Sequence, residues 1–178
     1  TYPFPNSMSE SDFLEINNLV ELKTKNIKII KNPYFVRLNE MSPLDREILV
    51  ERHLMSREML AKNNAMVIVT DDEETSILVN EEDHLRLQVL ASGLQLKKCW
   101  KIINEIDDGY EKELPFAFST EYGYLTSCPT NVGTGMRASV LVHLPGLVLS
   151  RHINQVLKGL ENIGMAVRGY YGEGTESI

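Results

Sequence analysis

The chain has 178 residues, and its 18 lysines and arginines against 25 aspartates and glutamates give a formal net charge of −7. Hydrophobic residues make up 43% of the chain, which excludes wholesale disorder, and no apolar run approaches the roughly 20 residues of a membrane span. The acidic balance argues against broad nucleic-acid binding, and two cysteines are too few for a disulfide framework and fit a reducing cytosol. The length favours one compact domain with room for a small helical annex.

The first part of the chain predicts two helices with two strands between them. In residues 9–22 apolar side chains recur at helical spacing behind a serine cap, and residues 42–54 open on a Ser-Pro pair that is typical of a helix N-terminus. Residues 27–30 and 34–38 are β-branched or aromatic runs on either side of an Asn-Pro turn signal, so we expect a strand in each.

The middle of the chain predicts a hairpin and a further strand. Residues 65–69 and 75–80 are short apolar runs, and the acidic segment 71–74 between them is suited to a solvated turn. In residues 85–90 polar and apolar side chains alternate with a period of two, which is typical of a strand with one mixed face.

The rest of the chain predicts two long helices and two more strands. Residues 96–110 carry an apolar stripe at helical spacing, and residues 149–160 carry a second stripe that ends before Gly164, a residue suited to a left-handed helix cap. Strands are expected at residues 138–144 and 165–167.

These elements together indicate an α+β fold. Strands joined by short hairpins, with long helices inserted between them, are typical of an antiparallel β-sheet flanked by α-helices, and here we expect the helices on one face. The strict alternation of strand and helix that marks a doubly wound fold is missing. The sequence shows neither low-complexity segments nor internal repeats.

Three polar segments interrupt this pattern, and the first is residues 80–84, Asn-Glu-Glu-Asp-His, directly after a strand that we expect to be buried. Three carboxylates at one strand end repel one another unless a cation or a cationic substrate lies between them. By itself this cluster is more simply explained as a solvated acidic turn.

The second segment is the loop 126–137, which is rich in hydroxyl residues and glycine and ends on Arg137. Small residues let backbone N–H groups approach an anion closely, and an arginine adds a forked donor. Cys128 near an arginine could act as a thiolate, although a lone cysteine is more often structural. The loop matches neither the Walker pattern nor the dinucleotide-binding glycine pattern, and an ordinary glycine turn is the simpler alternative.

The third segment, residues 168–176, places Arg168 and Glu173 five residues apart in a glycine-spaced loop. A surface ion pair is the simpler explanation when this segment is taken alone. Taken together, the three segments offer Arg86, Arg137 and Arg168 for phosphates, and glutamates for a cationic partner.

That combination fits the transfer of a phosphoryl group to a guanidinium. A guanidinium nitrogen is a poor nucleophile at neutral pH because its charge is delocalised, but two carboxylates can fix its orientation and take up the departing proton. The transferring phosphoryl group spreads negative charge over its oxygens, so several arginines and Mg²⁺ must surround it. Alignment and electrostatic stabilisation then supply most of the acceleration.

Long stretches of the chain resemble signatures of the ATP:guanido phosphotransferases. They are residues 80–86, residues 123–131 with their continuation through residue 140, and residues 168–176, and their order and separations also fit. Within this family the chain is more similar to the bacterial protein-arginine kinases than to creatine or arginine kinases. The segments that favour this subgroup are Leu49–Leu54, Val132, Leu141–Pro145 and Tyr170–Gly174.

By matching position, the resemblance implies site residues. It implies that Glu82 and Glu173 bind the guanidinium and that Cys128 is the reactive cysteine. The resemblance assigns ATP binding to His53, Arg86, Arg137, Ala138, Ser139, Val140, Leu141, Arg168, Gly169, Tyr170, Tyr171, Gly172 and Glu173. It implies ATP and Mg²⁺ as cofactors, no metal ligands from the protein itself, and the family's antiparallel sheet with flanking helices.

The resemblance also has consequences beyond the site. Family members begin with a Ser-Ser-Arg-Ile-Arg type motif that this chain lacks upstream of Pro3, and they continue past the position of Ile178. Residues 1–178 are therefore expected to be a partial catalytic domain, an internal fragment of about half such an enzyme.

The resemblance implies protein substrates with exposed arginines, an activating adaptor and the Clp protease machinery as partners, and a homodimer. It also implies cytoplasmic stress regulation, with no nucleic acid and no membrane. A small-molecule phosphagen kinase and a non-catalytic domain that binds nucleotide or guanidinium stay open as alternatives.

Overall fold

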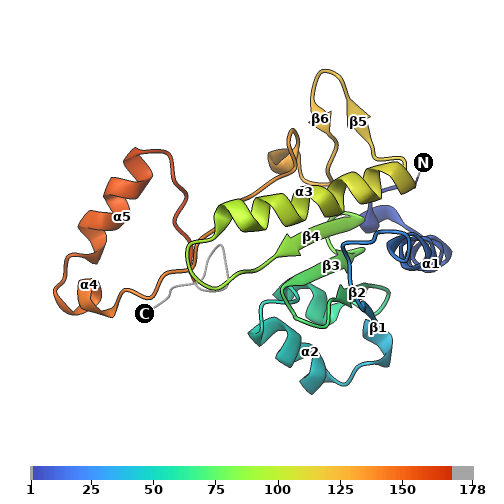
Figure 1. Ribbon diagram of the computed structural model, residues 1–178, viewed down its shortest axis with the longest axis horizontal. Helices are drawn as coiled ribbons and strands as arrows, with labels where there is room; N and C mark the ends of the chain where they lie inside the picture. The colour runs from blue at the N-terminus through green and yellow to red at the C-terminus, as the bar shows by residue number, and fades with distance from the viewer. Residues whose placement is uncertain (1, 170–178) are drawn as a thin grey trace. The chain divides into compact units, whose positions relative to one another are not determined.

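A computed structural model describes residues 2–169 of the chain, which forms two compact units, Thr1–Arg137 and Ala138–Ile178. The first unit is built on a four-stranded sheet of β1 (Tyr34–Arg37), β2 (Met66–Val69), β3 (Thr75–Val79) and β4 (Leu85–Val89) (Figure 1). The strands lie in chain order and every pair is antiparallel. The predicted α+β fold with an antiparallel sheet is therefore confirmed.

The two central strands are buried along their whole length, which decides how the sheet is covered. Every residue of β2 and β3 is buried, so apolar side chains leave these strands in both directions. Such continuous apolar runs need a cover on each face. The expectation that helices cover one face was therefore wrong, because both faces of the sheet carry a hydrophobic cluster.

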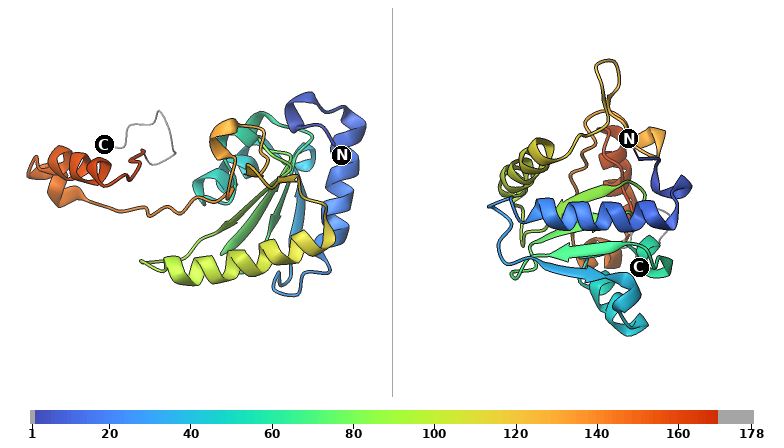
Figure 2. Two further views of the ribbon diagram at one scale, coloured as in Figure 1. Left: turned by 90° about the horizontal axis from the view of Figure 1, so that it is seen from above. Right: turned by 90° about the vertical axis from the view of Figure 1, so that its right-hand side faces the viewer.

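One face is covered by α1 (Glu10–Thr24) and α3 (Leu96–Glu113), as Figure 2 shows from two sides. The predicted Ser9 cap of α1 is confirmed as a capping box, because Ser9 and Asp12 each bind the other's backbone amide. The two helices are joined by the hydroxyl groups of Thr24 and Tyr110, which lie 2.6 Å apart in the buried core.

The opposite face is covered by α2 (Pro43–Glu51) and the 3₁₀ helix η3 (Arg57–Ala61), which contribute Val50 and Met59 to the second cluster. Arg46 of α2 ties this cover together, since its guanidinium donates to the carbonyl of Leu60 at 2.8 Å. The predicted Ser-Pro start of α2 is confirmed. The remaining 3₁₀ helices are η1 (Pro5–Ser7), η2 (Leu38–Glu40) and η4 (Pro129–Asn131).

Residues 27–30 form a turn, so the strand predicted there was wrong. The amide of Ile27 donates to the carbonyl of Thr24 at 3.0 Å, and that of Ile30 donates to the carbonyl of Ile27 at 3.1 Å. Both isoleucines are nevertheless buried under the sheet. The apolar run thus reflects packing of a turn against the core, which the one-dimensional pattern does not separate from a strand.

A short hairpin of β5 (Phe118–Ser119) and β6 (Gly123–Tyr124) follows α3, and the sequence pattern did not predict it. Two-residue strands are too short to show a period of two. Tyr124 also exchanges backbone hydrogen bonds with Gly133, at 2.8 and 3.2 Å, and these bonds close the glycine-containing loop onto the hairpin.

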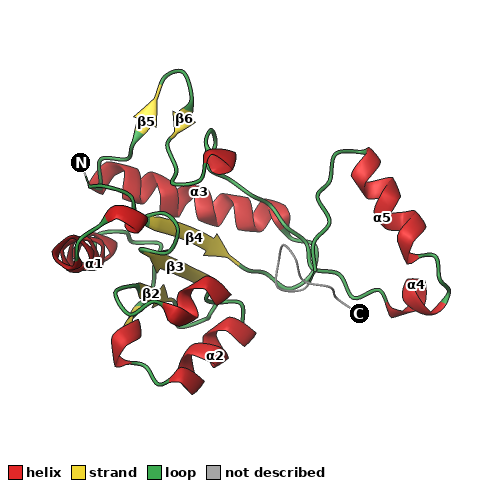
Figure 3. Ribbon diagram, turned by 180° about the vertical axis from the view of Figure 1, so that it is seen from behind, coloured by secondary structure: helices red, strands yellow, loops and turns green. Residues whose placement is uncertain are grey.

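The second unit contains α4 (Pro145–Leu149) and α5 (Ile153–Asn162), coloured red with the other helices in Figure 3. The prediction of one helix from residue 149 was wrong, because the chain breaks at Arg151, whose φ is +59°. The predicted cap at Gly164 is confirmed: its φ is +81°, and the next amide, of Met165, donates back to Leu160 at 3.1 Å.

Residues 138–144 and 165–167 do not form the predicted strands. Their composition favours extended backbone, but a strand also needs a hydrogen-bonding neighbour, and the strand pairings of the described residues do not include these segments. Within residues 2–169, no helix has both the length and the apolar character needed to cross a membrane.

Candidate functional site

The acidic segment 80–84 is the turn that joins β3 to β4. Asn80 opens it with a φ of +62°, a left-handed conformation that asparagine tolerates better than most residues. The amide of Asn80 donates to the carbonyl of His84 at 3.1 Å, and its side chain donates to Asn17 of α1 at 3.0 Å. The turn that follows the buried strand β3 therefore has a fixed shape, and its carboxylates have fixed backbone positions.

Glu81 is the buried carboxylate of this turn, and the sequence analysis did not select it. The residue is 4% exposed. Its Oε1 accepts from the Ser56 hydroxyl at 2.7 Å and from the Arg86 guanidinium at 3.0 Å, while its backbone carbonyl accepts from Lys62. One signal could have found it: an arginine on a half-buried strand needs a counter-charge, and the adjacent turn is the nearest source.

Arg86, predicted to bind phosphate, lies on β4 opposite Leu78 of β3. Leu85 and Leu87 of β4 pack against the α1 and α3 side of the sheet, so by strand alternation Arg86 lies on the other face. Its side chain remains 37% exposed while it pairs with Glu81. Arg86 is thus held on one side and still presents donors to solvent, as an anion-binding arginine requires.

His53, the predicted nucleotide-contacting histidine, follows α2 with a φ of +59°. Its carbonyl accepts from Nε2 of Gln88 at 2.6 Å, and Gln88 stands two residues along β4 from Arg86. Residues two apart on a strand share a face. The fold therefore brings the backbone of His53 to the same face of the sheet as Arg86.

Glu82 projects toward the loop that contains Cys128, from which it is distant in the sequence. Its Oε2 accepts from Nδ2 of Asn131 at 3.3 Å, and the next residue, Asp83, accepts from the backbone amide of Ser127 at 2.6 Å. These two hydrogen bonds dock residues 127–131 on the acidic turn. The structure therefore places the predicted guanidinium-binding glutamate and the loop of the predicted reactive cysteine side by side.

Cys128 lies at the start of η4 and is partly exposed. Its Sγ is 2.9 Å from the hydroxyl oxygen of Thr130, and its carbonyl accepts from Thr126 at 2.7 Å. The short helix and these contacts fix the thiol at the edge of the loop, next to the residues that bind Glu82 and Asp83.

His84 closes the turn against the N-terminal segment. Its ring stacks on Phe4 with centroids 6.2 Å apart and meets the edge of Tyr2 at 6.4 Å. Burial lowers the pKa of His84, and the charge of Asp83 and a hydrogen bond with the backbone of Pro3 oppose that shift. The imidazole is therefore biased toward its neutral form, which suits a packed ring.

The other predicted site residues lie later in the chain than the acidic turn and the Cys128 loop. Arg137 is exposed and ends the first unit. Ala138, Ser139, Val140, Leu141 and Arg168 are exposed in the second unit, and Gly169 there is partly exposed. Tyr170, Tyr171, Gly172 and Glu173 lie outside the described residues. Their predicted roles stay predictions.

The arrangement in the first unit combines a carboxylate accessible to solvent, a thiol on the loop that docks on the same turn, and an anchored guanidinium on the strand that follows. A carboxylate can orient a cationic acceptor and take up its proton, and an anchored arginine can hold a phosphate. Among the residues that the structure describes, no group of three or more His, Cys, Asp or Glu side chains could hold a metal ion.

Residues 15–178 match the profile of the ATP:guanido phosphotransferase C-terminal catalytic domain. The chain is 50% identical over 182 residues to the protein-arginine kinase of Symbiobacterium thermophilum, covering 98% of this chain and 51% of that protein. It is 47% identical over 180 residues to the protein-arginine kinase of Pelotomaculum thermopropionicum, covering 99% and 51% respectively. The chain thus spans about half the length of the curated relatives it matches.

The fold of this chain is similar to that of the duplicated taurocyamine kinase from Schistosoma mansoni, whose structure was solved with bound components of a transition-state analogue. The TM-score is 0.84 at 28% sequence identity, and the match covers 98% of this chain and 26% of that one. The sheet with its flanking helices is therefore the arrangement found in a guanidino kinase.

Proposed function

Because the chain belongs to the ATP:guanido phosphotransferase family, we propose that it is part of a protein-arginine kinase, which transfers the γ-phosphoryl group of ATP to arginine side chains of proteins. The observation that carries this proposal is the docking of residues 127–131 on the acidic turn, through Asn131 to Glu82 and Ser127 to Asp83. It supports an acceptor site to which the acidic turn contributes a carboxylate and the docked loop contributes a thiol.

In the proposed reaction Glu82 acts on the acceptor. Its carboxylate accepts hydrogen bonds from the arginine guanidinium, fixes its orientation and takes up the proton that leaves the attacking nitrogen. Cys128, beside it, contributes a polarisable group to the same side of the acceptor. Glu173, outside the described residues, is proposed as the second carboxylate because of its position in the family motif.

The proposed ATP site lies on the face of β4 that carries Arg86. A partly exposed guanidinium with its own carboxylate anchor fits a phosphate oxygen, and the His53 segment lies on the same face. Mg²⁺ would enter with the phosphates of ATP, where it neutralises charge during transfer. By family position, ATP binding is also proposed for Arg137, Ala138–Leu141 and Arg168–Glu173.

A protein acceptor is proposed over a small guanidino compound. Two relatives with 47–50% identity are named protein-arginine kinase, whereas the taurocyamine kinase is 28% identical. We further propose cytoplasmic stress regulation, in which phosphoarginine marks proteins for Clp-dependent degradation, with an activating adaptor and a homodimer. Two unpaired cysteines are consistent with a reducing compartment.

The test is phosphorylation of an unstructured basic protein, with Mg·ATP, by the purified full-length protein that contains this chain. Acid-labile phosphate on arginine is read by mass spectrometry, and free arginine and creatine are offered in parallel tubes. We expect labelled protein arginines, and a loss of at least about a hundredfold in rate for Glu82→Gln, because proton transfer by a placed side chain supplies about that factor.

Nucleotide binding provides the control for this variant. Glu82 acts on the acceptor, so Glu82→Gln should bind Mg·ATP with the affinity of the unchanged protein. Rapid turnover of free arginine or creatine without any label on protein arginines would contradict the proposed acceptor. A loss of ATP affinity in Glu82→Gln would contradict the proposed role of Glu82.

A further inference from the structure

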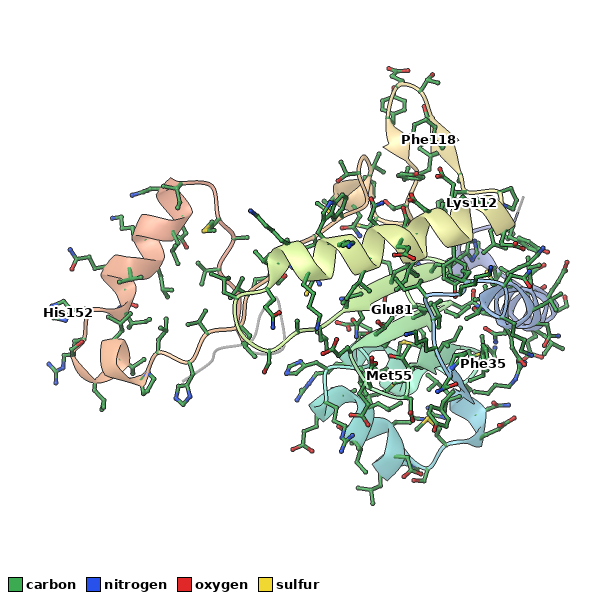
Figure 4. All side chains as sticks on the ribbon, in the orientation of Figure 1. Phe35, Met55, Glu81, Lys112, Phe118 and His152 are labelled. Atoms are coloured by element: carbon green, nitrogen blue, oxygen red, sulfur yellow. The ribbon has the colours of Figure 1, made fainter. Side chains whose placement is uncertain are left out.

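Glu81 has more protein partners than any other carboxylate of the acidic turn, and the proposed reaction does not use it directly. Figure 4 labels it beside the sheet. It is 4% exposed, whereas the adjacent Glu82 is exposed. A buried carboxylate is costly unless its oxygens are hydrogen-bonded, so the partners of Glu81 explain why it is tolerated there.

The two oxygens of Glu81 serve two different parts of the candidate site. Oε1 accepts from the Ser56 hydroxyl at 2.7 Å and from the Arg86 guanidinium at 3.0 Å. Oε2 accepts from the backbone amide of Glu82 at 3.0 Å. Ser56 follows His53 closely in the chain, so Oε1 faces the side of the turn where we propose that the nucleotide binds. Oε2 fixes the backbone of Glu82, the residue proposed to bind the acceptor.

We propose that Glu81 is a positioning residue that fixes Arg86 for the phosphates and Glu82 for the guanidinium at the same time. The inference rests on the proposed function and deepens it. A carboxylate at this point holds the two charged groups at a set separation, which in-line transfer between two bound reactants requires. Lys62, which donates to the backbone carbonyl of Glu81, steadies the backbone of the same residue.

If the Glu81–Arg86 ion pair were purely structural, the expected results would differ. Its removal would lower the stability of the fold, but it would not change the ATP affinity through Arg86. The chain offers a second, more exposed ion pair for comparison. Lys98 of α3 and Glu74 lie 3.0 Å apart at the β2–β3 turn, which is at the opposite end of β3 from Glu81.

The first experiment is a double-mutant cycle on Mg·ATP affinity, measured by calorimetry. Glu81→Gln keeps the size of the side chain and removes its charge, and we expect ATP to bind about tenfold more weakly, the effect of one lost charge-assisted hydrogen bond. In the background of Arg86→Ala the same change should alter the affinity less than about twofold, since there is no guanidinium left to position. Equal weakening in both backgrounds would overturn the inference.

The second experiment reads the positioning without any ligand. The ¹⁵N NMR signals of the Arg86 guanidinium and the Glu82 amide should both shift in Glu81→Gln, and both should stay in place in Glu74→Gln. Unmoved signals in Glu81→Gln would overturn the inference even if the fold and the activity were intact. Thermal unfolding of each variant checks that the variant is folded.

The two proposals fail in different ways. If the full-length protein that contains this chain neither binds Mg·ATP nor labels arginine, the proposed function is contradicted, and the NMR signals still decide whether Glu81 holds Arg86 and Glu82. If the unchanged protein binds and labels while Glu81→Gln behaves like Glu74→Gln in every measurement, the kinase proposal stands and the positioning role of Glu81 is contradicted.

Discussion

At the scale of single residues, adjacent side chains of the acidic turn have different partners. Asn80 binds α1, and Glu81 binds Ser56 and Arg86. Asp83 binds the backbone amide of Ser127, and His84 packs on the N-terminal segment. Glu82 is the exposed member. A cluster of carboxylates that looks uniform in sequence therefore contains one group open to a ligand and several that hold its surroundings.

Gly123 offers a residue-level test of how the Cys128 loop is held. Its φ is +81°, and an added Cβ would come within 2.5 Å of the carbonyl oxygen of Gly133. We expect Gly123→Ala to break the Tyr124–Gly133 backbone pairing and to lower the hydrogen-exchange protection of both amides at least about tenfold.

Gly93 is the matched control, because its φ is +74° but nothing lies within 4 Å of an added Cβ. Gly93→Ala carries the conformational cost of a left-handed alanine, about 1–2 kcal/mol, without the clash. It should leave the Tyr124 and Gly133 amides as protected as before. Equal loss of protection in the two variants would show that backbone strain, and not the close approach, controls this loop.

At the scale of elements, the sheet has two covers of different construction. On one side α1 and α3 share a buried hydroxyl contact between Thr24 and Tyr110, and on the other α2 is tied to η3 by a hydrogen bond from Arg46 to Leu60. Both covers reach the β3–β4 turn, because Asn17 of α1 binds Asn80 and Ser56, just before η3, binds Glu81. The candidate site thus depends on elements from both faces.

The contact between α1 and α3 predicts a specific alkaline destabilisation. Burial raises the pKa of Tyr110 to about 12 from its usual value of 10.0, and the hydrogen bond with Thr24 partly opposes that rise. Between pH 10 and 12 the folded protein therefore keeps the phenolic proton of Tyr110, whereas the unfolded chain has lost it. The contribution of this group to the free energy of unfolding is fully present below pH 10. It is lost as the pH rises toward 12, which lowers the free energy of unfolding by about 3 kcal/mol.

Urea unfolding at pH values from 9 to 12 measures this effect against Tyr110→Phe. The variant should be less stable at neutral pH by about 1 kcal/mol, since it loses the bond to the Thr24 hydroxyl, which still donates to the carbonyl of Val20 at 2.7 Å. It should also lose less stability in alkali. Parallel stability curves for the two proteins would contradict the assigned burial of the Tyr110 proton.

At the scale of the whole molecule, the two units differ in how much they bury. All residues of both hydrophobic clusters belong to the first unit, whereas α4 and α5 contain no buried residue among those described. Apolar burial is the main source of folding free energy. The stability of the described chain is therefore concentrated before Ala138.

This difference predicts the result of a truncation. A chain that ends at Arg137 should unfold in one cooperative transition, with a free energy of unfolding within about 1 kcal/mol of the longer chain, because it keeps both clusters. Urea unfolding followed by circular dichroism measures it. A broad transition, or a loss of several kcal/mol, would show that residues 138–178 contribute to the core.

The sequence by itself determined the family, the antiparallel α+β fold, the caps at Ser9 and Gly164, and the candidate residues Glu82, Cys128 and Arg86. These features follow from local patterns and from long motifs, both of which can be recognised in the sequence before the folded structure is known. The two covers of the sheet were missed, although β2 is apolar at every position and β3 is apolar from Ile77 to Val79, a pattern that needs a cover on each face.

Only the tertiary structure decided which residues of the acidic turn serve the site. The role of Glu81 depends on Ser56, 25 residues away, and the docking of the Cys128 loop depends on a bond from Ser127 to Asp83, 44 residues away. The strands predicted at residues 27–30 and 138–144 failed for a related reason. A strand requires a partner, and burial and pairing are properties of the folded chain that apolar composition alone does not specify.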